Sequence, residues 1–159
     1  MYNVGIITPE NAGAADRLIT FFKRFTYNDD INLTLIGASP CDSVFDVIVG
    51  MSRSAFEDAS AYNLSGDARL IVDTDLRRGV FKVSGGAQVI SYGLNSRACV
   101  TASSVGDEVL TLCVQRSITN LKNEKIDEQE FTIPLADIGI NPLIGMAAAA
   151  LVCGAEIHV

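Results

Sequence analysis

The chain has 159 residues, which suits one domain with a core of its own. Hydrophobic residues make up 48% and charged residues 19%, which favours strands buried on both faces or an apolar surface that a partner covers. The net charge of -7 argues against nucleic acid or an anionic membrane as partner, and no apolar run reaches the roughly 18 residues of a transmembrane helix.

The first half of the chain predicts strands that alternate with helices. An apolar strand begins at Val4 and passes through the turn Thr8–Asp16 into a helix with apolar residues Leu18, Ile19, Phe22 and Phe25. Further strands are predicted at Ile31–Gly37, Phe45–Gly50, Arg69–Asp73 and Gln88–Tyr92. A short helix, capped by Ser52 or Ser54, is predicted through Ala61, and Asp75–Ser84 fits a strand or a helix equally. This spacing is typical of βαβ units, so residues 1–93 are expected to form a parallel α/β part within one domain, 1–159.

The second half has a different pattern. Three consecutive strands are predicted at Ala98–Val105, Glu108–Ser117 and Gln129–Pro134, with a polar turn at Thr119–Asp127 between the last two. Residues 98–134 therefore predict a small antiparallel meander. Pro142–Cys153 predicts an uncharged helix within residues 141–154, which Gly154 would end. A helix that is apolar all round is buried, in the domain core by preference or otherwise between subunits.

Four segments also match, in order, the motifs of a known family. Val4–Gly13 stands where the family has a strand followed by Gly-Thr-Asn-Gly-Lys-Thr, and Leu70–Asp75 where a strand ends in Asn-x-Asp-Asp. Val89–Ala102 is similar to the family's strand with Tyr/Phe-Gly and Ala-Asp-x-x-Ala, and Ile138–Gly154 to its Asn-containing, alanine-rich helix, here with Asn141 but without the His. The chain thereby resembles the central, ATP-binding domain of the Mur ligases, cytosolic amide-forming enzymes of peptidoglycan synthesis.

The resemblance implies a particular fold. It implies a three-layer α/β domain with a mostly parallel, Rossmann-like sheet flanked by helices. A small antiparallel meander would lie toward the C-terminus.

Departures from the family pattern bear on function. The loop lacks the Lys and Thr of the family, and Ile31–Leu70 contains no Lys or His to replace the family's metal-binding and modified residues. Phosphoryl transfer depends on such cations, so we expect no catalytic residues, no metal ligands and no cofactor. The first hypothesis is a cytoplasmic, non-catalytic binding or scaffold protein that acts as a homo-oligomer or pairs with a ligase-like partner. The alternatives are an ATP- and Mg-dependent amide-ligase subunit completed by a partner chain, and a small-molecule sensor that uses the altered cleft.

Thr8, Asn11 and Gly13 are the candidate ligand-binding residues, because backbone N–H groups at a helix N-terminus bind anions. A plain turn with Asn11 as the helix cap is the favoured alternative. Asp73 and Asp75 follow a strand at the edge where such sheets bind ligands, but we expect exposed turn residues there.

The four cysteines, Cys41, Cys99, Cys113 and Cys153, are widely scattered. They form no CxxC pair, and each lies in or near an apolar stretch. We therefore expect buried free thiols rather than disulfides or a metal site, as is usual in a reducing cytosol.

Overall fold

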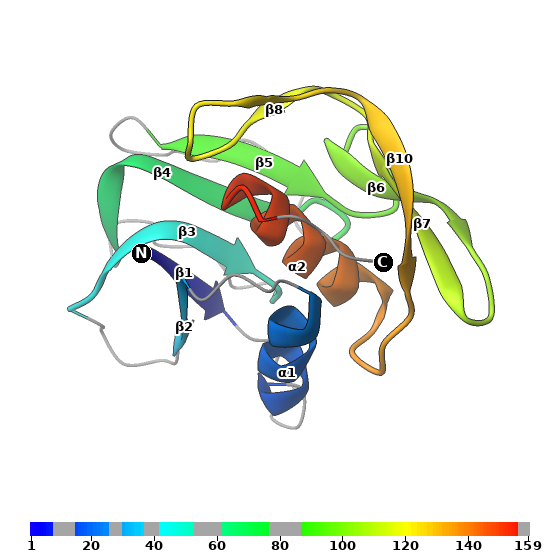
Figure 1. The fold of residues 1–159 in the computed structure, drawn as a ribbon, viewed down its shortest axis with the longest axis horizontal. Coiled ribbons are helices and arrows are strands. Elements are labelled where there is room, and N and C mark those ends of the chain that lie inside the picture. The colour runs from blue at the N-terminus through cyan, green and yellow to red at the C-terminus, as the bar shows by residue number, and fades with distance from the viewer. Residues whose placement is uncertain (8–14, 26–29, 37–41, 53–61, 77–86, 156–159) are drawn as a thin grey trace.

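The computed structural model describes residues 1–7, 15–25, 30–36, 42–52, 62–76 and 87–155 (Figure 1). The helices of these residues are α1 (Ala15–Phe25) and α2 (Ile140–Val152). The strands are β1 (Tyr2–Ile7), β2 (Ile31–Ile36), β3 (Val44–Gly50), β4 (Asn63–Asp73), β5 (Gln88–Tyr92), β6 (Val100–Val105), β7 (Val109–Val114), β8 (Ile118–Thr119), β9 (Lys125–Ile126) and β10 (Gln129–Pro134).

Eight of these strands form one mixed sheet in the order β10-β7-β6-β5-β4-β3-β1-β2. Neighbours from β2 to β6 pair in parallel, whereas β7 pairs antiparallel with both β6 and β10. The short strands β8 and β9 pair with each other on either side of residues 120–124, which lie in the segment predicted as a turn. Because β1, β4 and β5 run in the same direction, their carboxyl ends share one edge of the sheet.

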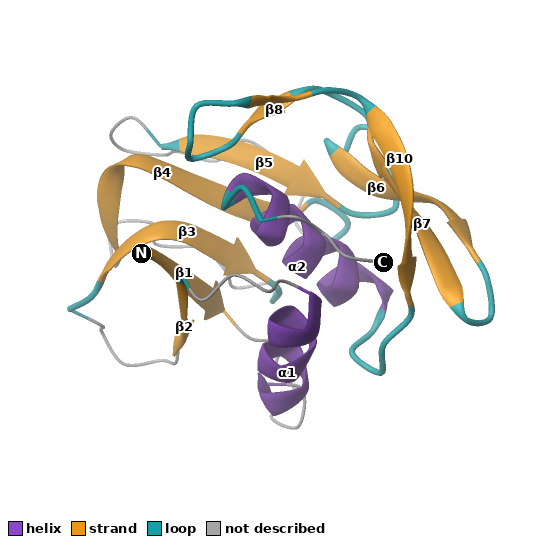
Figure 2. Ribbon diagram, viewed as in Figure 1, coloured by secondary structure: helices purple, strands orange, loops and turns teal. Residues whose placement is uncertain are grey.

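The predicted three-layer, helix-flanked, Rossmann-like fold is wrong. The described residues are mostly strand, and both of their helices lie on the same face of the sheet (Figure 2). The predicted antiparallel strands continue the main sheet, because Tyr92 of β5 pairs with Val100 of β6. The helix predicted from Ser52 or Ser54 and most of Asp75–Ser84 lie outside the described residues.

α2 lies at the centre of the core, which is the placement that its apolar sequence favoured over a subunit interface. It packs on β3, β4, β5 and β6 and against α1, and nine of its residues are buried within the chain itself. At Gly145 the backbone meets the ring of Tyr92 so closely that an added Cβ would lie 2.8 Å from the ring. No helix in the described part of the chain has both the length and the apolar character needed to cross a bilayer.

The opposite face of the sheet carries a smaller apolar cluster. It consists of Ile7, Ile36, Phe45, Ile48, Leu70 and Val72. Successive strand residues therefore contribute to the two faces in turn, as Val47 and Val49 face α2 while Ile48 faces away. This burial on both faces accounts for the high hydrophobic fraction of the chain.

Candidate functional site

A network of polar side chains lies at the carboxyl edge of the sheet. It joins Asp73 at the end of β4, Asp75 two residues later, Asn95 after β5 and Asn141 in the first turn of α2. The Asn141 amide nitrogen donates to both carboxylate oxygens of Asp73, at 3.3 and 3.2 Å, and to Asp75 Oδ2 at 2.8 Å. Asn95 Nδ2 donates to Asp75 Oδ1 at 2.8 Å. We call these four residues the carboxyl-edge network.

The local backbone explains how the carboxylates are held. Asp73 Oδ1 accepts from the backbone N–H of Asp75 at 2.9 Å and of Leu76 at 3.3 Å, which forms an Asx turn directly after β4. The backbone N–H of Leu94 donates to Asp75 Oδ2 at 2.6 Å. Gly93 allows this approach, because its φ of +147° disfavours other residues and a Cβ there would lie 2.8 Å from the Asp75 carboxyl group.

The two carboxyl groups are shifted in opposite directions. Burial raises the pKa of Asp73, which is only 5% exposed, and the donors around it offset this only in part. Burial also acts to raise the pKa of Asp75, but the hydrogen bonds from Leu94, Asn95 and Asn141 outweigh it and lower that pKa below its ordinary value. The neighbouring Tyr92 hydroxyl has a pKa well above its usual range, because of burial and then the charges of both aspartates.

The geometry indicates what this network can do chemically. Every carboxylate oxygen of Asp73 and Asp75 already accepts at least one hydrogen bond from the chain itself. Within the described ranges, no group of three or more His, Cys, Asp or Glu is arranged to hold a metal ion. The network therefore joins β4, β5 and α2 to one another.

The candidate ligand residues Thr8, Asn11 and Gly13 lie outside the described residues, so their role stays a prediction. The helix that follows them lines an open pocket of about 280 Å³, together with residues 136–138 before α2. Two residues of its lining, Arg17 and Asp137, form an ion pair at 3.0 Å. Its volume lies just below the range for small-molecule sites, which is about 300–1,000 Å³.

Sequence reasoning identified part of the network. It selected Asp73, Asp75 and Asn141, which the structure brings together, but it expected both aspartates to be exposed and Asp73 is buried. It missed Asn95, which also donates to Thr74 Oγ1 at 2.7 Å. An Asn two residues after the glycine that ends a strand was the available signal.

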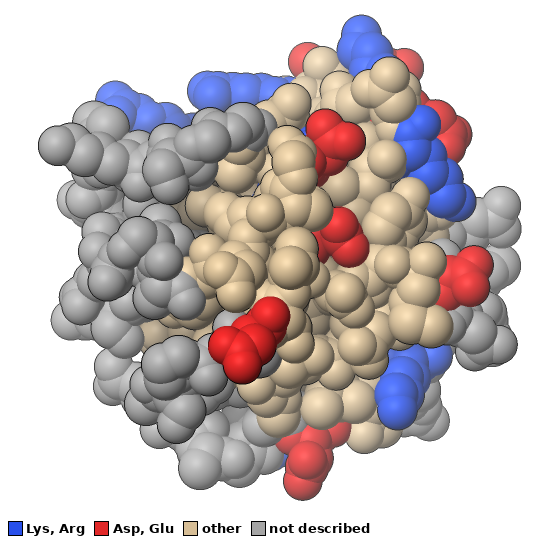
Figure 3. Space-filling model, turned by 90° about the vertical axis from the view of Figure 1, so that its left-hand side faces the viewer, with Lys and Arg blue, Asp and Glu red and all other residues tan. Residues whose placement is uncertain are grey.

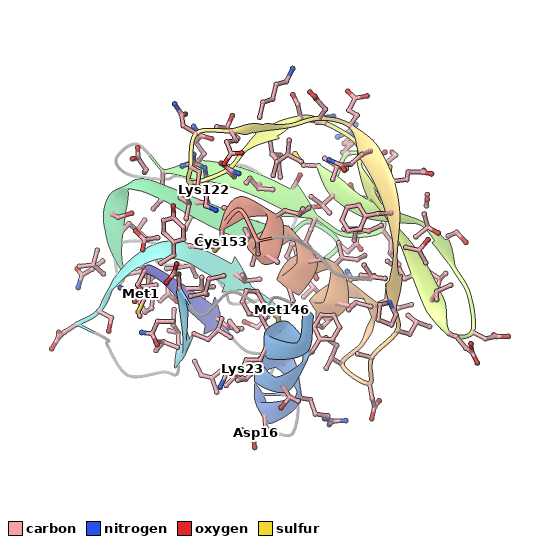
Figure 4. The ribbon with its side chains drawn as sticks, viewed as in Figure 1. Met1, Asp16, Lys23, Lys122, Met146 and Cys153 are labelled. Carbon is pink, nitrogen blue, oxygen red and sulfur yellow. The ribbon has the colours of Figure 1, made fainter. Side chains whose placement is uncertain are left out.

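Three cysteines lie in the described residues, and all three are free thiols. Cys153 is fully buried, whereas Cys99 and Cys113 are half-buried, so the expectation of buried thiols is met fully only at Cys153. Cys153 lies near Lys122 at the end of α2 (Figure 4), and burial raises the pKa of its thiol to about 12. An unpaired thiol of this kind packs as a small apolar side chain.

Comparison with known proteins finds no matching family model and no similar curated protein.

Proposed function

We propose that this chain is a non-catalytic binding and assembly protein of the cytoplasm. The observation that carries the proposal is that donors from the chain itself reach every carboxylate oxygen of Asp73 and Asp75. Carboxylates held in this way serve to join β4, β5 and α2. The unpaired Cys99, Cys113 and Cys153 support a reducing compartment.

A degenerate relationship to the Mur ligase central domain belongs to the same proposal. Asp73, Asp75, Asn95 and Asn141 come from three of the four segments that carry the resemblance, and they are hydrogen-bonded to one another. This convergence supports the relationship. The sheet differs from the one that the resemblance implies, so the relationship does not extend to a shared layer architecture.

Calorimetric titration with Mg-ATP, and then with ADP, tests whether the chain binds a nucleotide. We expect no heat of binding up to about 1 mM nucleotide, which corresponds to a binding free energy weaker than about -4 kcal/mol. Micromolar binding would overturn the proposal and favour a ligase subunit completed by a partner chain.

A loop variant shows where any nucleotide binds. Gly13→Val changes one of the candidate loop residues, and its branched side chain would restrict the approach of a phosphate to the backbone. Heat that disappears in Gly13→Val would assign binding to this loop. Heat that persists in this variant would assign nucleotide binding to another part of the protein. Either result would contradict the proposal that the chain binds no nucleotide.

A further inference from the structure

β2 forms one edge of the eight-stranded sheet, and no other described strand pairs with its outer side. Its sequence, Ile-Asn-Leu-Thr-Leu-Ile, contains no charged residue and no proline. The other edge strand, β10, carries Glu130 and Pro134, both exposed. Charged residues and proline are the usual protection of a sheet edge against pairing with another chain. β10 has this protection and β2 does not.

The pairing of β2 with β1 determines which backbone groups point outward. Tyr2 N–H donates to the carbonyl oxygen of Asp30 at 2.8 Å, which begins the parallel ladder between the two strands. In such a ladder alternate residues direct both N–H and C=O toward the same neighbour. The outward groups of β2 therefore belong to Ile31, Leu33 and Leu35.

We propose that β2 is a dimerisation surface, which pairs antiparallel with β2 of a second copy so that Leu33 lies opposite Leu33 of that copy. In this register Ile31 lies opposite Leu35, so the three residues with outward backbone groups all form hydrogen-bonded pairs. On the helix-covered face the pairs are apolar: Ile31 and Leu33 pack on the core, and Leu35 is 37% exposed. On the other face Asn32 lies opposite Thr34, and this pair is polar on both sides.

Other registers match less well. A shift by two residues, with Leu33 opposite Leu35, places Ile31 opposite position 37, which lies beyond the end of β2. The chosen register also keeps like charges apart, because the two Asp30 residues lie at opposite ends of the paired strands, roughly 20 Å from each other at about 3.3 Å per residue. Much of the described surface on the side toward which β2 lies in Figure 1 is uncharged (Figure 3).

This inference names the partner for the assembly role proposed above and rests on it. A closed two-fold dimer follows from the antiparallel pairing, since the β2 edge of each copy is then used once and no further copy can add at this strand. The dimer would join two eight-stranded sheets into one continuous sheet across the two-fold axis.

Sedimentation velocity of the full chain between about 1 and 100 µM tests the dimer. We expect the wild-type chain to dimerise and Leu35→Lys to raise the dimer dissociation constant at least about tenfold, because two exposed lysines replace apolar pairs at the new interface. Thr132→Lys on the exposed part of β10 is the matched control and should leave the dissociation constant unchanged. Circular dichroism verifies that both variants fold. A wild-type chain that stays monomeric at about 100 µM, or a Leu35→Lys variant that dimerises as well as wild type, would overturn the inference.

Cysteine cross-linking tests the register. Under mild oxidation Leu33→Cys should give a covalent dimer through a disulfide between the two introduced thiols, since paired residues of neighbouring strands lie within the Cα separation that a disulfide spans. Thr34→Cys should not, because Thr34 faces Asn32. Peptide mass spectrometry separates this bridge from those of the native cysteines, and a bridge at position 34 alone would contradict the register. A monomer leaves the nucleotide result unaffected, so the two proposals fail separately.

Discussion

The two ends of α2 are joined to the sheet by different kinds of contact. At its first turn, Asn141 binds two carboxylates through hydrogen bonds of 2.8–3.3 Å. From Leu143 onward the helix is apolar and nearly all of it is buried. The first contact depends on protonation and on single donors, whereas the second depends on shape. The same helix therefore responds to pH at one end and to side-chain volume along the rest.

Asn141→Ala should have the largest effect on stability. Removal of the amide leaves the buried Asp73 without its side-chain donor, and we expect the free energy of unfolding to fall by about 3 kcal/mol. Urea denaturation measures it. Asn95→Ala is the control at the more exposed side of the network, with an expected loss of about 1 kcal/mol. Equal losses for the two variants would show that burial of Asp73 does not set the strength of this contact.

Gly145→Ala tests the apolar contact. Alanine normally favours a helix by up to about 1 kcal/mol over glycine, but here its Cβ would lie 2.8 Å from the Tyr92 ring. We expect a net destabilisation of about 2 kcal/mol in urea denaturation.

The double variant separates this clash from other effects of the substitution. In the background of Tyr92→Leu, which removes the ring, Gly145→Ala should lower the free energy of unfolding by about 1 kcal/mol less than it does in the wild-type background. The same cost in both backgrounds would exclude the ring as the cause.

The strands could be predicted from the sequence because each buried strand is an apolar run bounded by turn residues. Gln88–Tyr92 was predicted with the bounds of β5, and Phe45–Gly50 differs from β3 by one residue. β4 was predicted from Arg69 but begins at Asn63. Its first residues, Asn63–Asp67, include Leu64 as their single large apolar side chain, so they show no hydrophobic pattern that would predict a strand.

The layers and the network could not be predicted in the same way. The sequence shows that α2 is buried but not which face of the sheet it covers, nor that α1 shares that face. Asn141 is 68 positions from Asp73, and their contact depends on where α2 crosses the sheet. The burial of Asp73 follows from that crossing, so an aspartate in a turn after a strand gave no sign of it.

Asp75→Asn separates the polar end of α2 from the apolar part through pH. The pKa of Asp75 is lowered in the folded state, so its ionised form adds stability above the pKa of the unfolded chain, and this stability is lost as the pH falls through the folded pKa. The raised pKa of Asp73 has the opposite sign: its ionisation costs stability, and the cost disappears on acidification. Between about pH 5 and 2.5 the free energy of unfolding should therefore fall less in Asp75→Asn than in wild type. The difference should be less than about 1 kcal/mol, because Asp75 is exposed to screening solvent.

Urea denaturation at several pH values measures this difference. Asp107→Asn, in the exposed turn between β6 and β7, is the control and should follow the wild-type curve. If the free energy of unfolding falls equally on acidification in wild type and Asp75→Asn, the network does not hold the Asp75 carboxylate in its ionised form.

The smallest effect is expected directly after α2, where the reactivity of the Cys153 thiol measures how well the apolar part of the helix stays packed. Cys153 is fully buried and its thiol has a pKa of about 12, so at pH 8 almost none of it is the reactive thiolate. Alkylation followed by peptide mass spectrometry should show Cys153 reacting at least about a hundredfold more slowly than the half-buried Cys113. Asn141→Ala should leave this ratio unchanged, since it breaks only the polar end of the helix. If Cys153 becomes reactive in Asn141→Ala while the rest of the chain stays folded, the two ends of α2 are coupled, and the polar network also controls the packing of the apolar part.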